Sequence, residues 1–155
     1  MCCAKGIGGG IPIAAILTTT KIAQCMQLGS HGTTFGGNPL ACAVAEQVMT
    51  LLTKKTLLNG VKKKEKIFLK ELESINDDYQ CFSAIRSSGL WIGCKLNVTE
   101  NFNLDTVMKA CYEKGLMILK ANDNTIRLAP SLIIEDDLIL KGLKILRVVI
   151  QEQHP

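Results

Sequence analysis

A lysine followed at once by a run of glycines constrains this chain more than any other feature. Residues 5–12 have the sequence KGIGGGIP, and a second glycine- and threonine-rich segment, HGTTFGGNP, occupies residues 31–39. Because glycine has no Cβ atom, its backbone adopts positive φ angles and approaches other groups closely. We therefore expect a tight loop at each segment, with Lys5 confined among backbone dipoles at the edge of the first.

Lys5 in such a loop suggests a specific chemistry. A crowded amine has a lowered pKa, and the unprotonated amine attacks aldehydes to form a Schiff base. Pyridoxal phosphate is the cofactor that uses such a lysine, and the protein must also hold its phosphate. The hydroxyls of Thr33 and Thr34 and the nearby glycine N–H groups suit an anion. The alternative interpretation is a surface lysine beside a flexible turn, and a lone lysine–glycine pair favours it.

Taken together, the two segments resemble those of the class III aminotransferases, the fold type I pyridoxal phosphate enzymes that act on ω-amino groups. Within that family they are most similar to the bacterial acetylornithine aminotransferases. The similarity continues through IRSSGLWIGCKL and KGLMILKANDNTIRLAPSL to the last helix. It implies that Lys5 is the Schiff-base lysine and that Thr34 contacts the cofactor phosphate across a dimer interface. It also implies that Thr33 touches the amino-acid substrate and that Arg127 lies near the substrate carboxylate and its gating glutamate.

The resemblance implies an α/β fold that is the C-terminal part of a PLP-dependent transferase: a remnant of the large-domain sheet plus a small α+β C-terminal domain. Residues 1–45 would end the large cofactor-binding domain, residues 46–75 would form a linking helix, and residues 76–155 would form the small domain. In the family, a long segment before the lysine carries the phosphate-binding turn, the ring-stacking aromatic and the aspartate of the pyridine nitrogen. We therefore expect a truncated portion with little transamination alone, or one half of an enzyme whose N-terminal half is separately encoded.

The reaction that the resemblance implies is transamination between N-acetylornithine and 2-oxoglutarate, a step of arginine biosynthesis. The partners would be an amino acid and a 2-oxo acid, both small molecules, and, in the full enzyme, a second copy in a homodimer. Succinyldiaminopimelate, ornithine or another ω-amino donor remain open as substrates. The alternative from another class is a non-catalytic remnant or interaction module that keeps the small domain and a dimerisation helix.

The lysines are unevenly spread and account for much of the net charge of +4. Residues 54–70 hold seven of them with a single aromatic, Phe68, placed on the apolar side of a helical pattern. A nucleic-acid surface would add stacking aromatics, so we expect a solvated helix face and no nucleic acid.

The cysteines and the hydropathy of the sequence indicate whether the protein holds a metal and in which compartment it lies. Seven cysteines occur without a CxxC pair, and with two histidines no zinc-ligand spacing can be assembled, so we expect no metal. Scattered cysteines of this kind are typical of a reducing compartment. No secretory signal and no apolar run of about 18 residues occurs, so we expect a cytoplasmic protein without a membrane span.

In the first part of the chain we expect a strand over residues 12–18, apolar on both sides as in a parallel sheet, with no partner strand in this chain. Residues 1–37 would then be disordered or aggregation-prone unless a partner supplies the rest of the sheet. A short helix over residues 21–27, capped by Thr19 or Thr20, and a longer one starting at Pro39 with Asn38 as its cap should follow.

The rest of the chain has stronger periodicity. After a break near Asn59 and Gly60, a second helix should bury a stripe at intervals of three, four and seven. Strands over residues 81–86 and 90–96 should form a hairpin, with Trp91 and Ile92 in the core. A helix capped by Asn103, strands at 116–119 and 125–128, and a final helix should follow. The apolar stripes that we expect inside the two long helices are Val61, Phe68, Leu72 and Ile75, then Leu138, Leu143, Leu146 and Val149 or Ile150.

Overall fold

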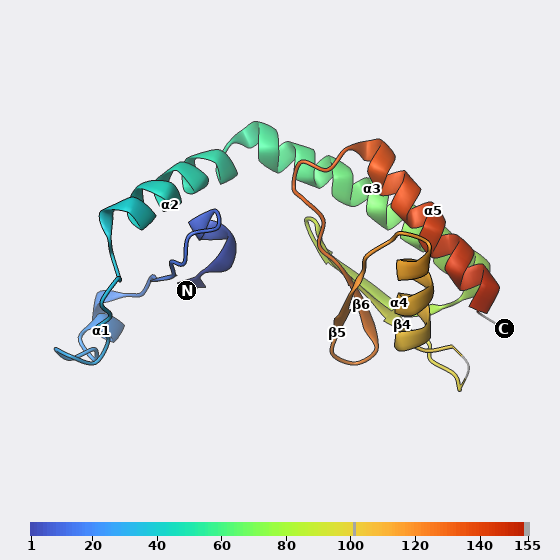
Figure 1. Ribbon diagram of the computed structural model, residues 1–155, viewed down its shortest axis with the longest axis horizontal. Coiled ribbons are helices and arrows are strands. Elements are labelled where there is room, and N and C mark those ends of the chain that lie inside the picture. The colour runs from blue at the N-terminus through green and yellow to red at the C-terminus, as the bar shows by residue number, and fades with distance from the viewer. Residues whose placement is uncertain (101, 154–155) are drawn as a thin grey trace. The chain divides into compact units, whose positions relative to one another are not determined.

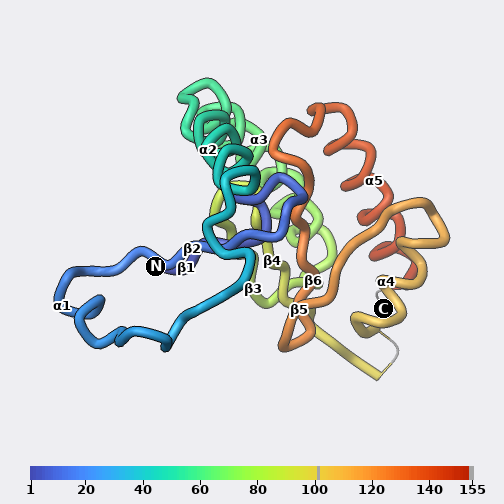
Figure 2. The backbone as a smooth tube through the Cα atoms, turned by 60° about the vertical axis from the view of Figure 1, so that its left-hand side comes forward, coloured from blue at the N-terminus to red at the C-terminus, as the bar shows by residue number. Residues whose placement is uncertain are grey.

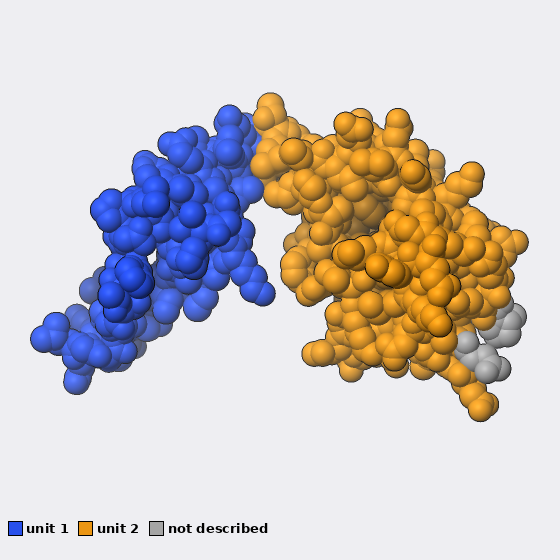
Figure 3. Space-filling model, in the orientation of Figure 1, with its two compact units in different colours: residues 1–55 blue, residues 56–155 orange. Residues whose placement is uncertain are grey.

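The computed structural model describes residues 1–100 and 102–153. The chain divides into two compact units, residues 1–55 and residues 56–155, which Figure 3 colours separately. Within the described part of the chain, no helix combines the length and the apolar character that crossing a bilayer requires.

The first unit contains a short strand pair and two helices. Its elements are β1 (Cys2–Cys3), the 3-10 helix η1 (Lys5–Gly8), β2 (Ala15–Ile16), α1 (Thr20–Ala23) and α2 (Pro39–Leu52). β1 and β2 run antiparallel side by side, with Cys2 opposite Ile16 (Figure 2). The N-terminal ammonium closes the pair by donating a hydrogen bond to the Leu17 carbonyl at 2.6 Å.

The predictions for this strand are therefore wrong in three respects. The strand covers two residues instead of residues 12–18, it pairs antiparallel, and its partner lies in this chain. The Ile16 side chain is 66% exposed, so the strand is not buried on both sides. A short apolar run specifies neither the length of a strand nor its partner, because both depend on which segment the chain brings beside it.

The start of α2 follows its sequence signals. Pro39 occupies the first turn, and the Asn38 side chain accepts a hydrogen bond from the Ala41 N–H at 2.9 Å, as predicted. The predicted break near Asn59 and Gly60 is wrong. α2 ends at Leu52, and α3 (Lys55–Tyr79) runs through both residues without interruption.

The second unit is a four-stranded antiparallel sheet with helices on one face (Figure 1). Its strands have the order β3-β4-β6-β5, and β3 and β4 form the predicted hairpin around Gly89. The helices α3, α4 and α5 cover one face of this sheet (Figure 1). Besides α3, the elements are β3 (Phe82–Ser88), β4 (Trp91–Leu96), α4 (Leu104–Glu113), β5 (Leu119–Ala121), β6 (Thr125–Leu128) and α5 (Asp136–Gln153).

The core of the second unit lies between the sheet and these helices. The predicted stripe of α3 is confirmed, since Phe68, Leu72 and Ile75 are buried and Val61 packs against them. In α5 the stripe begins one residue later than predicted: Leu138 is 54% exposed, whereas Ile139 is 1% exposed. The buried residues that the strands and α4 contribute include Ile92, Cys94, Leu96, Val107, Cys111, Ile126 and Leu128.

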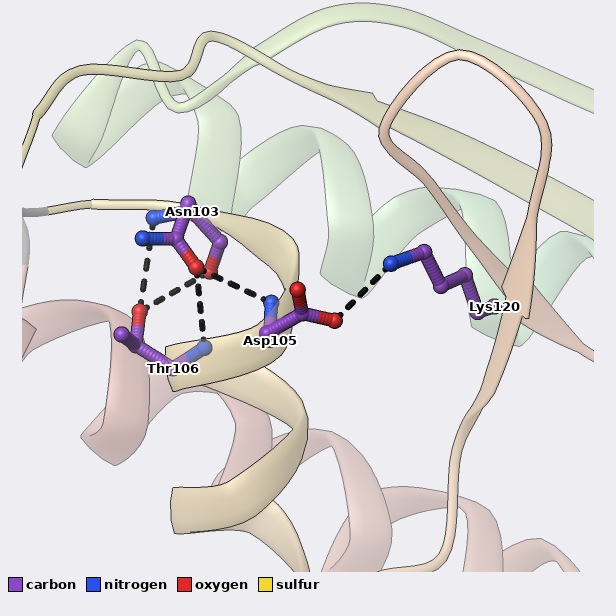
Figure 4. Close-up of polar contacts among 4 residues, drawn as sticks. All are labelled: Asn103, Asp105, Thr106 and Lys120. Atoms are coloured by element: carbon purple, nitrogen blue, oxygen red, sulfur yellow. Dashed lines mark hydrogen bonds and ion pairs between the residues drawn. The ribbon is translucent and has the colours of Figure 1, made fainter.

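Local polar contacts fix the ends of these elements. The Asn103 side chain accepts hydrogen bonds from the N–H groups of Asp105 and Thr106, both at 3.1 Å, and the Thr106 hydroxyl completes a capping box (Figure 4). Lys120 of β5 forms an ion pair with Asp105 at 2.9 Å (Figure 4). On α3, Lys63 and Lys64 pair with Asp136 at the start of α5.

Candidate functional site

Lys5 begins the 3-10 helix η1 and has a positive φ of 54°. Its side chain is exposed and forms no hydrogen bond or ion pair with any residue that the structure describes. The expectation that the glycine loop confines this lysine is therefore wrong for the chain by itself. The glycines approach α2 closely instead, and the lysine lies at the start of the loop, outside that contact.

The glycine loop is fixed against the middle of α2. Gly9 has a φ of +55°, and a Cβ atom added to it would lie 3.1 Å from the Val48 Cγ2 atom and 3.4 Å from the Val44 Cγ1 atom. A Cβ atom added to the buried Gly8 would lie 3.0 Å from the Ile13 Cγ2 atom. A side chain at either position would push the loop away from its neighbours, so these two glycines set the position of Lys5 relative to α2.

The threonine loop is fixed to the start of the same helix. The Asn38 side-chain amide donates a hydrogen bond to the Phe35 carbonyl at 2.9 Å, while its oxygen caps α2. A Cβ atom added to Gly36 would overlap the Thr33 methyl group, so a side chain at Gly36 would require Thr33 to move. Thr33 and Thr34 are both exposed, and their hydroxyls form no hydrogen bond with described residues.

The two loops thus share α2 as their support and present unpaired polar groups. An amine can form a Schiff base with an aldehyde, and two hydroxyls can donate hydrogen bonds to a phosphate. The sequence of residues 1–45 contains lysines but no aspartate or glutamate, so no side-chain carboxylate of this segment would repel a phosphate. The side-chain groups of this segment therefore suit a phosphate-bearing aldehyde such as pyridoxal phosphate. Among the described residues, no cluster of histidine, cysteine and carboxylate side chains could hold a metal ion.

A second group of polar residues lies on the outer face of the sheet in the second unit. The Arg127 guanidinium carbon lies 5.1 Å from the centroid of the Trp91 ring, and the Arg127 Nε atom is buried without a partner among the described residues. The prediction that Trp91 belongs to the core is wrong, because this residue is 61% exposed. Its neighbour Ile92 is fully buried, and the two-residue period of a strand places adjacent side chains on opposite faces.

Comparison with protein families and known proteins identifies the relatives of this chain. The family model described as Aminotransferase class-III matches residues 1–150. The chain is 48% identical over 149 residues to the succinylornithine transaminase of Yersinia pseudotuberculosis, covering 96% of this chain and 36% of that protein. It is 46% identical over 141 residues to the acetylornithine/succinyldiaminopimelate aminotransferase of Buchnera aphidicola, covering 91% of this chain and 35% of that protein.

Solved structures of aminotransferases are also similar to this chain. An acetylornithine aminotransferase from Elizabethkingia anophelis is 32% identical, with a TM-score of 0.83 over 97% of this chain and 38% of that chain. Ornithine δ-aminotransferase from Plasmodium falciparum is 27% identical, with a TM-score of 0.86 over 99% of this chain and 39% of that chain.

The chain spans slightly more than a third of the length of these relatives, and the part that it matches is their C-terminal part. The α/β fold that the resemblance implies is thereby confirmed. This chain belongs to the class III aminotransferase family.

Proposed function

We propose that this chain carries the lysine-bearing C-terminal part of a pyridoxal phosphate-dependent aminotransferase that acts on an N-acylated ornithine. N-acetylornithine with 2-oxoglutarate is the preferred pair, which would place the reaction in arginine biosynthesis. One observation supports this most: the glycine loop of Lys5 and the threonine loop are both fixed to α2 while their amine and hydroxyls remain unpaired. The names of the relatives, acetylornithine and succinylornithine transaminases, support an acylated ornithine as the donor.

In this proposal Lys5, Thr34 and Thr33 have distinct roles. Pyridoxal phosphate, when bound, supplies the electron sink that makes the hydrogen on the substrate carbon acidic. The Lys5 Nζ atom would hold the aldehyde end of the cofactor until the substrate amine displaces it. The freed amine would then take a proton from the substrate carbon as a general base and donate it to the cofactor side as a general acid. Thr34 donates its hydroxyl hydrogen to the phosphate, and Thr33 contacts the substrate. Thr34 would serve the site of a second copy in a homodimer, as the family resemblance implies.

A trapping experiment tests the role of Lys5. The chain is mixed with pyridoxal phosphate, reduced with borohydride and digested, and the modified lysines are identified by mass spectrometry. We expect labelling to concentrate on Lys5 and to be lost in Lys5→Ala. Lys21→Ala is the matched control, because Lys21 is an exposed lysine of the same unit outside both loops. Equal labelling of the wild type and Lys5→Ala would refute the assignment and leave an interaction module as the function.

A second comparison tests the role of Thr34. Pyridoxal has the same aldehyde as pyridoxal phosphate but lacks the phosphate group. We expect Lys5 to prefer pyridoxal phosphate to pyridoxal, and Thr34→Val to reduce that preference about tenfold, since a hydrogen bond to a charged group contributes roughly 1.5–3 kcal/mol. A Thr34→Val variant with an unchanged preference would remove Thr34 from the phosphate site.

A further inference from the structure

One carboxylate of α3 holds the tip of the hairpin that β3 and β4 form. The Glu65 Oε1 atom accepts a hydrogen bond from the Ser87 hydroxyl at 2.7 Å and another from the Gly89 N–H group at 3.0 Å. Hydrogen bonds to an ionised carboxylate are shorter and stronger than those between neutral groups. Glu65 is also the single acidic residue among the seven lysines of residues 54–70, and it bonds to the hairpin. The carboxylate therefore ties two separate elements of the second unit together.

The tip of this hairpin lies close to α3. Ser88 and Trp91 form the last pair of the strand register. The turn between them therefore consists of Gly89, whose φ is +61°, and the buried Leu90. A Cβ atom added to Gly89 would lie 2.9 Å from the Val61 Cγ1 atom, so the turn approaches the helix as closely as glycine allows. The carboxylate supplies the polar contacts of a turn that apolar packing also holds.

Trp91 follows this turn directly, as the first residue of β4. Side chains alternate between the faces of a strand, so Ser87 and its register partner Ile92 lie on the helix-covered face, whereas Trp91 lies on the outer face. Trp91 is mostly exposed, so neighbouring side chains restrict its ring little. The place of the ring thus follows from the backbone of the turn that Glu65 holds.

Arg127 in turn depends on this ring. The Arg127 guanidinium carbon lies 5.1 Å from the centroid of the Trp91 ring, and stacking uses the flat face of the group. The Arg127 Nε atom is buried and has no hydrogen-bond acceptor among the described residues. No ion pair within the described part of the chain includes Arg127 either. The Trp91 ring is therefore the group that limits the rotamers of this side chain.

We propose that Glu65 is a positioning residue for Arg127: it fixes the turn before Trp91, and the Trp91 ring fixes the guanidinium. The family resemblance implies that Arg127 lies near the substrate carboxylate, so the value of this coupling for the reaction rests on the proposed function. The coupling itself needs neither Lys5 nor a cofactor, so it can be measured on the chain alone.

Site-resolved arginine modification measures the coupling. Phenylglyoxal reacts with accessible guanidinium groups, and mass spectrometry after digestion gives the rate at each arginine. Arg147 is the internal reference, because α5 carries it and Asp78 and Ser74 hold it outside the hairpin. In Glu65→Ala we expect the rate at Arg127, relative to that at Arg147, to rise about threefold, because the turn loses both charge-assisted hydrogen bonds. General loosening of the fold would raise both rates together and would overturn the proposal.

Trp91 supplies an independent signal, because it is the only tryptophan in the chain. Its fluorescence anisotropy decay reports nanosecond motion of the ring. In Glu65→Ala the amplitude of the fast phase should roughly double, since such side-chain motion is fast once its restraint is removed. Glu65→Gln keeps an acceptor oxygen at the same distance from the helix and should restore part of both signals.

Two further variants complete the test. Glu73→Ala is the matched control, since it removes an exposed carboxylate of α3 that does not contact the hairpin, and it should behave as the wild type does. Ser87→Ala removes only one of the two hydrogen bonds, and it should change both signals in the same direction by a smaller amount. Circular dichroism checks that each variant is folded, and Ser87→Ala decides the matter if Glu65→Ala is not. A folded Glu65→Ala or Ser87→Ala with the wild-type rate ratio would overturn the proposal, even if the Trp91 ring became more mobile.

Trapping at Lys5 separates this inference from the proposed function. We expect Glu65→Ala to leave the labelling of Lys5 by pyridoxal phosphate unchanged, because the two residues belong to different units. Selective trapping at Lys5 with an unchanged rate at Arg127 would refute the positioning role alone. A raised rate at Arg127 without selective trapping at Lys5 would refute the proposed function alone.

Discussion

Gly9 shows how one residue sets the position of the candidate lysine. Its positive φ and its close approach to Val48 both disfavour a side chain. We expect Gly9→Ala to lower the free energy of unfolding by about 1–2 kcal/mol, because an L-residue in the left-handed region is strained. The measurement is urea unfolding followed by circular dichroism.

Gly6 provides the control within the same loop. A Cβ atom at Gly6 would meet no other atom within 4 Å, and Gly6 does not have a positive φ. Gly6→Ala should therefore unfold at the same urea concentration as the wild type or a higher one. If Gly6→Ala and Gly9→Ala were equally stable, the contact between the glycine loop and α2 would be wrong.

Residue-level predictions from the sequence succeed where the determinant is local. The caps Asn38 and Asn103 are confirmed, because each depends on neighbours within a few residues. The prediction that Leu138 is buried is wrong for the opposite reason. Leu138 and Ile139 are equally apolar, and only the packing of α5 on the sheet decides which of them is buried.

At the scale of elements, the cap of α4 makes a measurable contribution. Asn103→Ala removes the acceptor of two N–H groups, and we expect it to lower the free energy of unfolding by about 1 kcal/mol. Asn59→Ala is the control, since Asn59 lies exposed inside α3 and alanine is the better helix former there. An Asn103→Ala variant as stable as Asn59→Ala would contradict the capping box in Figure 4.

Gly60 tests the continuity of α3. A Cβ atom at Gly60 would meet no atom within 4 Å, and the residue is helical. We expect Gly60→Ala to raise the free energy of unfolding by about 0.5–1 kcal/mol, because alanine loses less conformational entropy in a helix. A loss of stability in urea unfolding would instead indicate a break at this point.

The error at Asn59 and Gly60 has a physical reason. Both are weak helix formers, so a local rule predicts an interruption. The stripe of Val61, Phe68 and Leu72 packs on the sheet along one helical face, and this burial outweighs a propensity cost of about 1 kcal/mol. Tertiary contacts of this kind cannot be read from a window of a few residues.

At the scale of the whole molecule, the buried thiols predict a loss of stability in alkali. Burial raises the pKa of the Cys94 thiol from 9.0 to about 12, and electrostatic repulsion from the Cys81 thiol adds a smaller part of this increase. Above about pH 9 the unfolded chain ionises these thiols while the folded chain keeps them neutral, so the free energy of unfolding falls as the pH rises toward 12. One such group contributes a slope of up to about 1.4 kcal/mol per pH unit.

Urea unfolding between pH 8 and pH 11 checks this expectation. Cys94→Ala should show a shallower decline with pH than the wild type, whatever its stability at neutral pH. Cys42→Ala is the control, because Cys42 is exposed. Parallel declines for the wild type and Cys94→Ala would show that this thiol does not drive the alkaline loss.

The two units also differ in how far their folds follow from the sequence. In the second unit, hairpins join strands that are close in the sequence, and the predicted order of elements is confirmed. In the first unit, β2 pairs with Cys2 and Cys3, residues that carry no strand signal of their own. For the candidate site, motifs predict Lys5 and Thr34, but the exposure of Trp91 and its contact with Arg127 depend on strand register.

Site-resolved labelling tests the central claim most directly. The chain is exposed to a limiting amount of pyridoxal phosphate, reduced, and mapped so that the label on each lysine is quantified. The account predicts that Lys5 carries most of the label, ahead of the exposed lysines of α3, and that added inorganic phosphate lowers the label at Lys5 selectively. Label spread over the lysines according to their exposure, with no effect of phosphate at Lys5, would contradict it.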